Sequence, residues 1–202
     1  MTDEVELTDA KQRVLDAAEE MFMEHGYAAI TLRDLAERLD IRQASLYYHF
    51  PDGKEQLYVE MAERAFQTHS EGMRGEMDAA GDDLRSQLLA IADWFAQHRP
   101  INVIGMMYAD LPALSRERAQ RLAQTAYEAL FFPLRDAFVE AQRRGEVRDI
   151  NPEMLAGFYL ALMDGITFSQ TKPVSVGRAE MAEAAIDMVL HGIMTGRHTA
   201  SE

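Results

Sequence analysis

Side chains that can read DNA bases stand together in residues 42–45. Arg42 and Gln43 are of the types that form paired hydrogen bonds with guanine and adenine edges in the major groove, and Ser45 follows them. Residues 41–51 contain no acidic side chain, although the chain as a whole is acidic. Because DNA phosphates repel carboxylates, this stretch suits a surface that meets a polyanion. The alternative is an ordinary solvated start of a helix.

Three further polar side chains follow in the same stretch: Tyr47, Tyr48 and His49. Each can donate a hydrogen bond to a phosphate oxygen, which holds a protein in register on DNA without reading its sequence. Tyr47 could also pack its ring inward while its hydroxyl reaches a phosphate, so core and contact roles are compatible. His49 could instead cap a helix C-terminus, where a positive charge is favourable.

A short helix must precede these side chains and fix their direction. Apolar residues recur in residues 32–39 at the spacing of one helical face. Thr31 is the expected N-cap, and Asp34 can reach back to it as in a capping box. Asp40 falls where the chain must turn, since Asp tolerates left-handed backbone better than most residues.

A second helix is expected after the turn, with Leu46 and Phe50 four residues apart and both facing inward. A Pro-Asp-Gly sequence ends it. A third helix then opens with Asp52 as its cap and Glu55 three residues on. Its free backbone N–H groups and Lys54 could meet a second phosphate.

These residues resemble the helix-turn-helix of the TetR family of repressors. The family pattern has a Thr cap, a Leu-Ala pair, a recognition helix ending Leu-Tyr-Tyr-His-Phe, and then Lys, Glu and Leu. In this sequence these stand at Thr31, Leu35 and Ala36, residues 46–50, and Lys54, Glu55 and Leu57. The sequence departs from the pattern in three places. Asp40 replaces the usual turn glycine, Arg42 replaces the usual Ser or Thr, and Lys54 comes one residue late.

The resemblance implies a dimeric regulator that binds a palindromic operator in double-stranded DNA and is released by a small-molecule effector. A helix-turn-helix DNA-binding domain would span residues 1–56, and a helical effector-binding and dimerisation domain residues 57–202. No cofactor, catalytic residue or metal ligand is expected. The residues expected at DNA are Thr31, Arg42, Gln43, Ala44, Ser45, Tyr47, Tyr48, His49 and Lys54.

The formal charge of -14 is the main objection to DNA binding, because affinity for DNA comes largely from neutralised phosphates. The charge of the proposed contact segment is different. Residues 41–54 contain Arg42 and Lys54 against Asp52, which gives a net charge of +1. The contact segment therefore does not share the negative net charge of the whole chain.

Helical periodicity continues along the rest of the chain without an alternating strand pattern, so we expect an all-α fold. The first helix is expected from about Asp9 to His25, with Gly26 as its C-terminal stop. A long helix over residues 115–144 contains Pro133, whose missing N–H should bend or split it.

The last two expected helices, over residues 152–170 and 176–193, are too apolar for a single buried stripe. Such surface needs a partner, and the resemblance implies a four-helix bundle with the same helices of a second copy. A dimer also suits DNA binding, because its two DNA-binding domains can contact half-sites related by two-fold symmetry. The alternative is a monomer in which both helices are fully buried.

Large apolar side chains of the second domain could line an effector pocket, as the resemblance implies. Most such side chains in helical domains are simply core, which is the alternative for each of them. Four acids in apolar surroundings could pair with a cationic effector, or with Arg or backbone N–H groups: Asp93, Asp110, Glu128 and Asp164. The candidate pocket residues are Trp94, Met106, Met107, Tyr108, Tyr127, Phe131, Phe158 and Met163.

One set of residues could be mistaken for a metal site. Glu183, Asp187 and His191 stand at spacings of four on one expected helix, so the outer two lie roughly 12 Å apart. A solvated face or an interface ion pair is the better interpretation. The rival class of protein is an all-α enzyme or metal-carboxylate bundle with an incidental helix-turn-helix. It would need converging carboxylates or histidines, which the sequence does not supply.

The composition favours the cytoplasm. The chain has no cysteine, its acidic start lacks the form of a signal peptide, and no apolar run approaches the length of a membrane span. We therefore expect no membrane partner.

Overall fold

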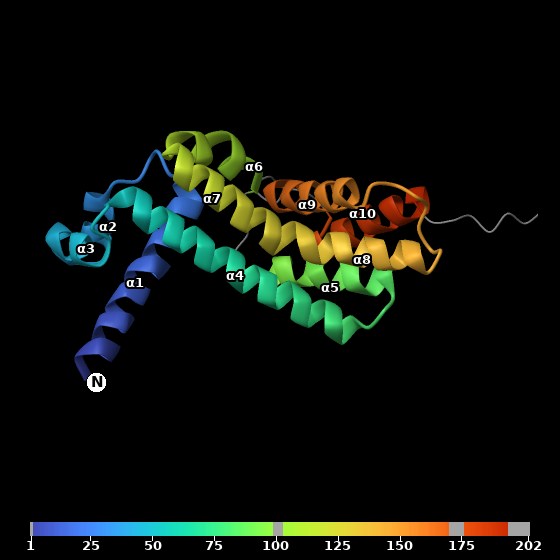
Figure 1. The fold of residues 1–202 in the computed structure, drawn as a ribbon, viewed down its shortest axis with the longest axis horizontal. Helices are drawn as coiled ribbons and strands as arrows, with labels where there is room; N and C mark the ends of the chain where they lie inside the picture. The colour runs from blue at the N-terminus through green and yellow to red at the C-terminus, as the bar shows by residue number, and fades with distance from the viewer. Residues whose placement is uncertain (1, 99–102, 170–175, 194–202) are drawn as a thin grey trace, which may run out of the picture. The chain divides into compact units, whose positions relative to one another are not determined.

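The computed structural model of the chain describes residues 2–98, 103–169 and 176–193. Every regular element in these ranges is a helix, which confirms the all-α expectation (Figure 1). Two elements, η1 and η3, are π-helical, and η2 is a 3-10 helix. The elements are α1 (Thr2–His25), α2 (Leu32–Arg38), α3 (Gln43–His49), α4 (Lys54–Ala80), α5 (Leu84–Gln97), α6 (Val103–Gly105), η1 (Met106–Asp110), η2 (Leu111–Ala113), α7 (Arg116–Ala126), η3 (Tyr127–Phe131), α8 (Phe132–Arg143), α9 (Pro152–Ser169) and α10 (Arg178–Ile193).

The chain divides into two compact units. The first comprises residues 1–68 and 101–126, and the second comprises residues 69–100 and 127–202. The helix-turn-helix segment therefore packs in one unit with α6, η1, η2 and α7, which come much later in the sequence. The predicted boundary between residues 56 and 57 lies inside α4 and stays a prediction.

Helix α1 places four apolar residues in the core of the first unit: Val14, Leu15, Ala18 and Phe22. It ends at Gly26, as predicted, where φ is +81° and the N–H of Gly26 donates to the carbonyl of Phe22. The predicted start at Asp9 was wrong, because α1 begins at Thr2. The preceding residues contain no Gly or Pro, and acidic side chains are favourable near a helix N-terminus.

The core of the second unit lies between α5, α8, α9 and α10. Helix α5 packs against α10, and α8 packs against α9. The hydroxyl of Tyr159, fully buried on α9, donates to the carbonyl of Leu88 on α5 at 2.6 Å. Burial raises the pKa of Tyr159, so this hydroxyl keeps its proton and remains a donor.

The long helix predicted over residues 115–144 is split, as the presence of Pro133 suggested. Helix α7 passes into the π-helical turn η3, and Pro133 then lies in the first turn of α8. Proline is tolerated there because the N–H of a residue in the first turn has no intrahelical partner. The sequence predicted the interruption but not its π-helical form.

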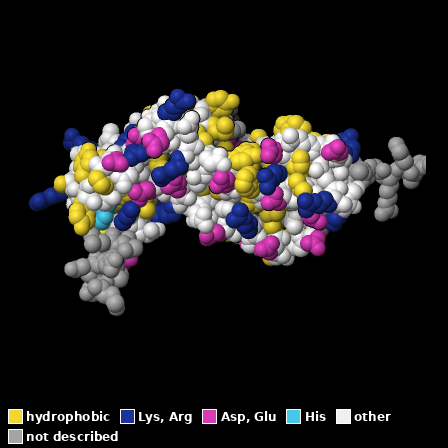
Figure 2. All heavy atoms as spheres, viewed as in Figure 1, with side chains coloured by type: hydrophobic (Ala, Val, Ile, Leu, Met, Phe, Trp, Pro, Cys, Tyr) yellow, Lys and Arg dark blue, Asp and Glu magenta, His cyan; other side chains and the backbone are white. Residues whose placement is uncertain are grey.

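Acidic and basic side chains alternate over much of the face shown in Figure 2, with apolar side chains between them. In the second unit, Arg144 pairs with Glu146 at 2.7 Å. In the described part of the chain, no helix is both long and apolar enough to cross a membrane.

Gly72 of α4 lies against the ring of Trp94 of α5, so a Cβ atom at this position would overlap the indole. We expect Gly72→Ala to lower the free energy of unfolding by about 1–3 kcal/mol, the usual cost of overpacking a core. Chemical denaturation followed by circular dichroism measures the change.

Gly75→Ala is the matched control, because a Cβ on Gly75, one turn along the same helix, would meet nothing within 4 Å. Ala is the better helix former, so this variant should gain about 0.5–1 kcal/mol. Equal effects of the two substitutions would contradict the close approach of α4 and α5.

Candidate nucleic-acid interface

The start of α2 is fixed by the capping box that the sequence predicted. The hydroxyl oxygen of Thr31 accepts the N–H of Asp34 at 3.2 Å, and a carboxylate oxygen of Asp34 accepts the N–H of Thr31 at 2.8 Å. The Thr31 hydroxyl also donates to this carboxylate at 2.7 Å. These bonds to the charged form hold the pKa of Asp34 below its usual range. Thr31 must therefore release Asp34 before its hydroxyl can donate to a phosphate.

The end of α2 is closed by a left-handed residue at the turn. Asp40 has φ of +53°, which confirms the predicted conformation. The N–H of Asp40 donates to the carbonyl of Glu37, and the N–H of Ile41 donates to the carbonyl of Ala36. These two bonds define a Schellman motif, in which Asp40 occupies the position that Gly usually takes. The departure from the family pattern at residue 40 thus leaves the turn intact.

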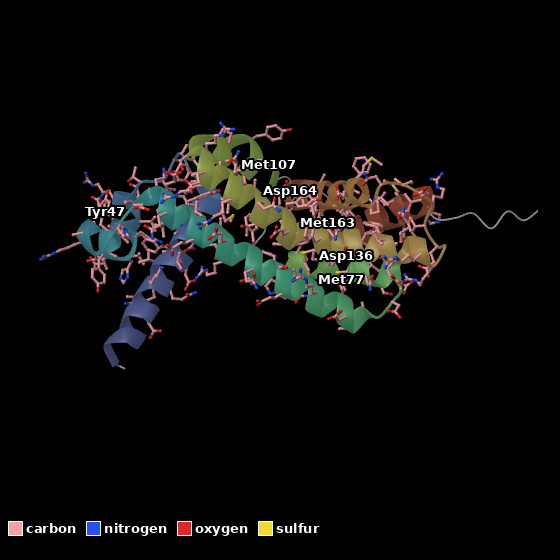
Figure 3. All side chains as sticks on the ribbon, in the orientation of Figure 1. Tyr47, Met77, Met107, Asp136, Met163 and Asp164 are labelled. Carbon is pink, nitrogen blue, oxygen red and sulfur yellow. The ribbon has the colours of Figure 1, made fainter. Side chains whose placement is uncertain are left out.

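Helix α3 buries one side and exposes the side predicted to meet DNA. Leu46 and Phe50 are fully buried. Tyr47 and Tyr48 are 48% and 69% exposed, and His49 is half-buried. Figure 3 labels Tyr47 on this helix. The other predicted contacts at its start are all exposed: Arg42, Gln43, Ala44 and Ser45.

Tyr47 is partly packed and partly exposed, and its contact with phosphate stays a prediction. Its ring lies near Gly53, because a Cβ atom on that glycine would be 3.5 Å from Tyr47 Cε1. About half of the side chain nevertheless remains exposed.

The cations of the helix-turn-helix differ in their ionic partners. Arg33 pairs with Glu37 at 2.9 Å, and Arg38 pairs with Glu20 at 3.2 Å. Arg42 is in no ion pair among the described residues, and it is exposed. Its full charge is therefore available to an external anion.

The start of α4 differs from the prediction. Glu55 does not complete a capping box with Asp52, because its carboxylate accepts the N–H of Ser115 and lies 3.6 Å from Arg118. The N–H of Asp52 instead donates to the side chain of Gln56 at 2.9 Å. The sequence could not show this, since the competing partners come from the start of α7, some sixty residues later.

Lys54 lies against an aromatic ring of its own unit. Its ammonium is 4.0 Å from the ring centroid of Tyr27, a cation–π distance. Burial lowers the pKa of Lys54, while the nearby charges of Asp110 and Asp34 oppose that shift. A phosphate contact by Lys54, which stays a prediction, would have to compete with this arrangement.

Asp110 connects η1 to both α4 and the end of α1. One carboxylate oxygen accepts the N–H of Tyr27 at 2.9 Å, and the other accepts the hydroxyl of Tyr58 at 2.8 Å. Burial, followed by the charge of Asp110, raises the pKa of Tyr58 well above its usual value. The sequence marked Asp110 only as an acid in apolar surroundings. The structure confirms the backbone N–H alternative and adds a tyrosine that sequence reasoning missed.

The predicted pocket residues are divided between the two units, and their role in a pocket stays a prediction. Met106 to Tyr108 belong to the first unit and the other five to the second. Met107, Tyr108 and Phe158 are exposed, and Tyr127 stacks on Phe131 with ring centroids 5.2 Å apart. The sequence could not separate pocket from core, because both use the same apolar side chains.

Trp94 belongs to an aromatic cluster in the second unit. Its indole N–H donates to Nδ1 of His69 at 3.1 Å, and its ring stacks on His98. Met163 of α9 is buried in the same unit.

Glu183, Asp187 and His191, which lie on one face of α10, contact other groups of the second unit. Arg85 of α5 bonds Asp187 at 2.8 Å and Glu183 at 3.0 Å, so these acids form ion pairs within the second unit. His191 contacts the carbonyl of Asp187 through Nδ1. Within the described ranges, no group of three side chains is placed to hold a metal ion.

The cap, the Schellman turn and the exposed polar face of α3 together define a helix-turn-helix protein of the DNA-binding class. Residues 14–61 match the family model described as "Bacterial regulatory proteins, tetR family". In this segment the chain is similar to the DNA-binding domain of the tetR family.

Curated relatives match a stretch of similar length. The negative transcriptional regulator IcaR of the biofilm operon icaADBC, from Staphylococcus epidermidis, is 41% identical over 56 residues. This alignment covers 28% of the present chain and 30% of the relative. IcaR of Staphylococcus aureus strain Newman aligns to the same extent. The likeness in sequence is thus confined to less than a third of these relatives.

Solved structures resemble nearly the whole chain. A transcriptional regulator from Saccharomonospora viridis in complex with choline has a TM-score of 0.75 at 21% identity, covering 94% of this chain and 100% of the other. A tetR-family regulatory protein from Rhodococcus RHA1 has a TM-score of 0.76 at 21% identity, covering 93% and 98%. At this identity the likeness shows the fold, an N-terminal helix-turn-helix followed by a helical domain.

The bond between Tyr58 and Asp110 should contribute measurably to the stability of the first unit. We expect Tyr58→Phe to lower the free energy of unfolding by about 1.5–3 kcal/mol, the usual range for a hydrogen bond to a charged group. Thermal and urea unfolding measure the loss.

Tyr27→Phe provides the control, because Tyr27 reaches Asp110 through its backbone N–H, which the substitution retains. We expect a change within about 0.5 kcal/mol. If both variants lost the same stability, the hydroxyl of Tyr58 would not be the group that matters.

Proposed function

We propose that this chain is a ligand-responsive transcriptional regulator that acts as a repressor in the bacterial cytoplasm. It binds a palindromic operator as a dimer and is released by a small-molecule effector. The observation that carries the proposal is the face of α3, where Arg42 is exposed and outside any described ion pair. The description of IcaR as a negative transcriptional regulator supports repression.

In this proposal, Arg42, Gln43 and Ser45 read bases in the major groove. Tyr47, Tyr48 and His49 bind phosphates and hold α3 in register. We assign base contacts to the first group because residues at the N-terminal end of a recognition helix contact base edges.

The proposed dimer forms through α9 and α10. Each of these helices exposes large apolar side chains in the second unit: Met154 and Phe158 on α9, and Met188, which is 71% exposed, on α10. Alanine and glycine lie beside them on the exposed faces, at Ala161 and Gly192. A second copy would cover this surface and bring two α3 helices to one palindrome.

The proposed effector is a small molecule that lowers the affinity of the protein for DNA when it binds. The neighbour from Saccharomonospora viridis, which was solved with choline, shows that a protein of this fold can hold a small cation. An effector can shift the DNA-binding equilibrium only by the difference in its affinity for the two states.

Operator binding tests the role of Arg42. An operator is selected from random duplex DNA, and its affinity is measured by fluorescence anisotropy. We expect Arg42→Ala to weaken binding by about 5- to 150-fold, corresponding to the roughly 1–3 kcal/mol of one base-reading arginine.

Arg33→Ala is the control in the same assay. It removes an equal charge from the neighbouring helix, but that charge is already paired with Glu37. Its affinity should stay close to that of the parent protein. Equal losses in the two variants would show a general charge effect, and failure to select any operator would refute the proposal.

A charge on the exposed face of α9 tests the dimer. Phe158 is 56% exposed, so Phe158→Glu should fold normally, while burial of its carboxylate in an interface would be costly. We expect sedimentation velocity to show a dimer for the parent and a monomer for this variant at micromolar concentration.

Tyr108→Glu places the same charge on an exposed aromatic position of the first unit and should leave the dimer intact. A parent protein that sediments as a monomer would defeat the dimer proposal.

A further inference from the structure

A cavity of about 270 Å³ lies within the first unit, between the end of α1, the middle of α4 and η1. Its volume is near the lower end of the range for small-molecule sites. Except for Met106, its lining contains none of the eight candidate pocket residues, but it includes Asp110, one of the four acids considered as partners of a cationic effector. It is therefore a separate candidate site, close in the chain to the helix-turn-helix.

The walls of the cavity are aromatic and apolar. Phe22 of α1 and Tyr58 and Phe66 of α4 contribute their rings, and Met106 of η1 adds a thioether. Phe22 and Tyr58 meet edge to face with ring centroids 5.3 Å apart. Aromatic faces carry negative electrostatic potential, so such walls favour a cation over an anion of the same size.

The charged lining is acidic. Asp110 and Glu24 both line the cavity, and no Lys or Arg does. Each oxygen of Asp110 accepts one described hydrogen bond, from Tyr27 or Tyr58, and a carboxylate oxygen can accept a second. Glu24 lies 3.8 Å from His25, which also lines the cavity.

Lys54 does not occupy this site. Its charge acts on Asp110, but its ammonium is held over the ring of Tyr27, and it is not among the lining residues. The cavity thus combines carboxylate oxygens and ring faces without a lysine or arginine in its lining.

We propose that this cavity binds a small organic ammonium ion that carries an apolar or aromatic group. The ammonium lies near Asp110 and Glu24, and the apolar part contacts the rings of Phe22, Tyr58 and Phe66. The proposal does not depend on DNA binding, because it concerns a site that can be measured in the protein alone.

Three probes of similar size separate charge from hydrophobicity: 2-phenylethylammonium, 2-phenylethanol and 3-phenylpropionate. Isothermal titration calorimetry of the full chain at neutral pH, without DNA, should show the ammonium binding at least about tenfold more tightly than the alcohol. The carboxylate should not bind detectably. Equal affinity for ammonium and alcohol, or tighter binding of the carboxylate, would overturn the proposal.

The location of the probe is tested by NMR of methionine methyl groups. Met23 and Met106 line the cavity, whereas Met154 and Met188 are exposed in the second unit. The signals of the first pair should shift on addition of 2-phenylethylammonium, and those of the second pair should not. Shifts confined to the second pair would place the ammonium elsewhere and refute the assignment.

Two variants change the cavity in different ways. Glu24→Gln removes one exposed charge and should weaken ammonium binding several-fold, while the affinity for the alcohol stays the same. Ala62→Leu fills space in the lining and should abolish the binding of both probes.

The matched controls are Asp9→Asn on α1 and Ala79→Leu on α4, two exposed positions that do not line the cavity. Both should bind the ammonium as the parent does.

If Ala62→Leu does not fold, the comparison of Glu24→Gln with its control still tests the proposal. An unchanged affinity of Glu24→Gln for the ammonium would contradict it. Failure of operator selection, by contrast, would affect only the proposed function.

Discussion

Helix α3 is only seven residues long, so its position depends on side chains that it buries rather than on its own hydrogen bonds. Leu46 and Phe50 supply that burial, and both are completely removed from solvent. Because they lie four residues apart on one face, their burial sets the rotation of the helix about its axis. Everything proposed for DNA follows from this rotation, since it places Tyr47 and Tyr48 on the exposed side.

Several acids of the first unit form ion pairs with cations from a distant part of the chain. Arg118 of α7 pairs with Asp52 and Glu55 at the start of α4, and Arg121 pairs with Glu63 further along the same helix. These pairs are largely exposed, and each contributes little to stability. Their effect is on the distribution of charge: acids near the helix-turn-helix are neutralised by cations from a distant part of the sequence, while Arg42 keeps its charge. An acidic chain can thereby present a surface that does not repel phosphate.

Features that depend on neighbours in the sequence were predictable, and features that depend on distant partners were not. The capping box of Thr31, the left-handed Asp40 and the interruption at Pro133 each follow from a few adjacent residues. The contact of Glu55 with Ser115 and the cavity beside Asp110 require η1 and α7 to pack against the helix-turn-helix. No local pattern encodes that packing, because many helical surfaces could satisfy the same side chains.

Trp94 is the only tryptophan of the chain, and its surroundings give it a spectroscopic role. Its indole stacks on His98 with a centroid separation of 3.4 Å and donates its N–H to His69. Contact with an imidazole ring alters tryptophan emission, so the native fluorescence of this protein reports on one small cluster in the second unit. The ligands proposed for the first unit, DNA and an ammonium ion, would meet no tryptophan there. A change in emission when they bind would therefore show that the second unit has responded.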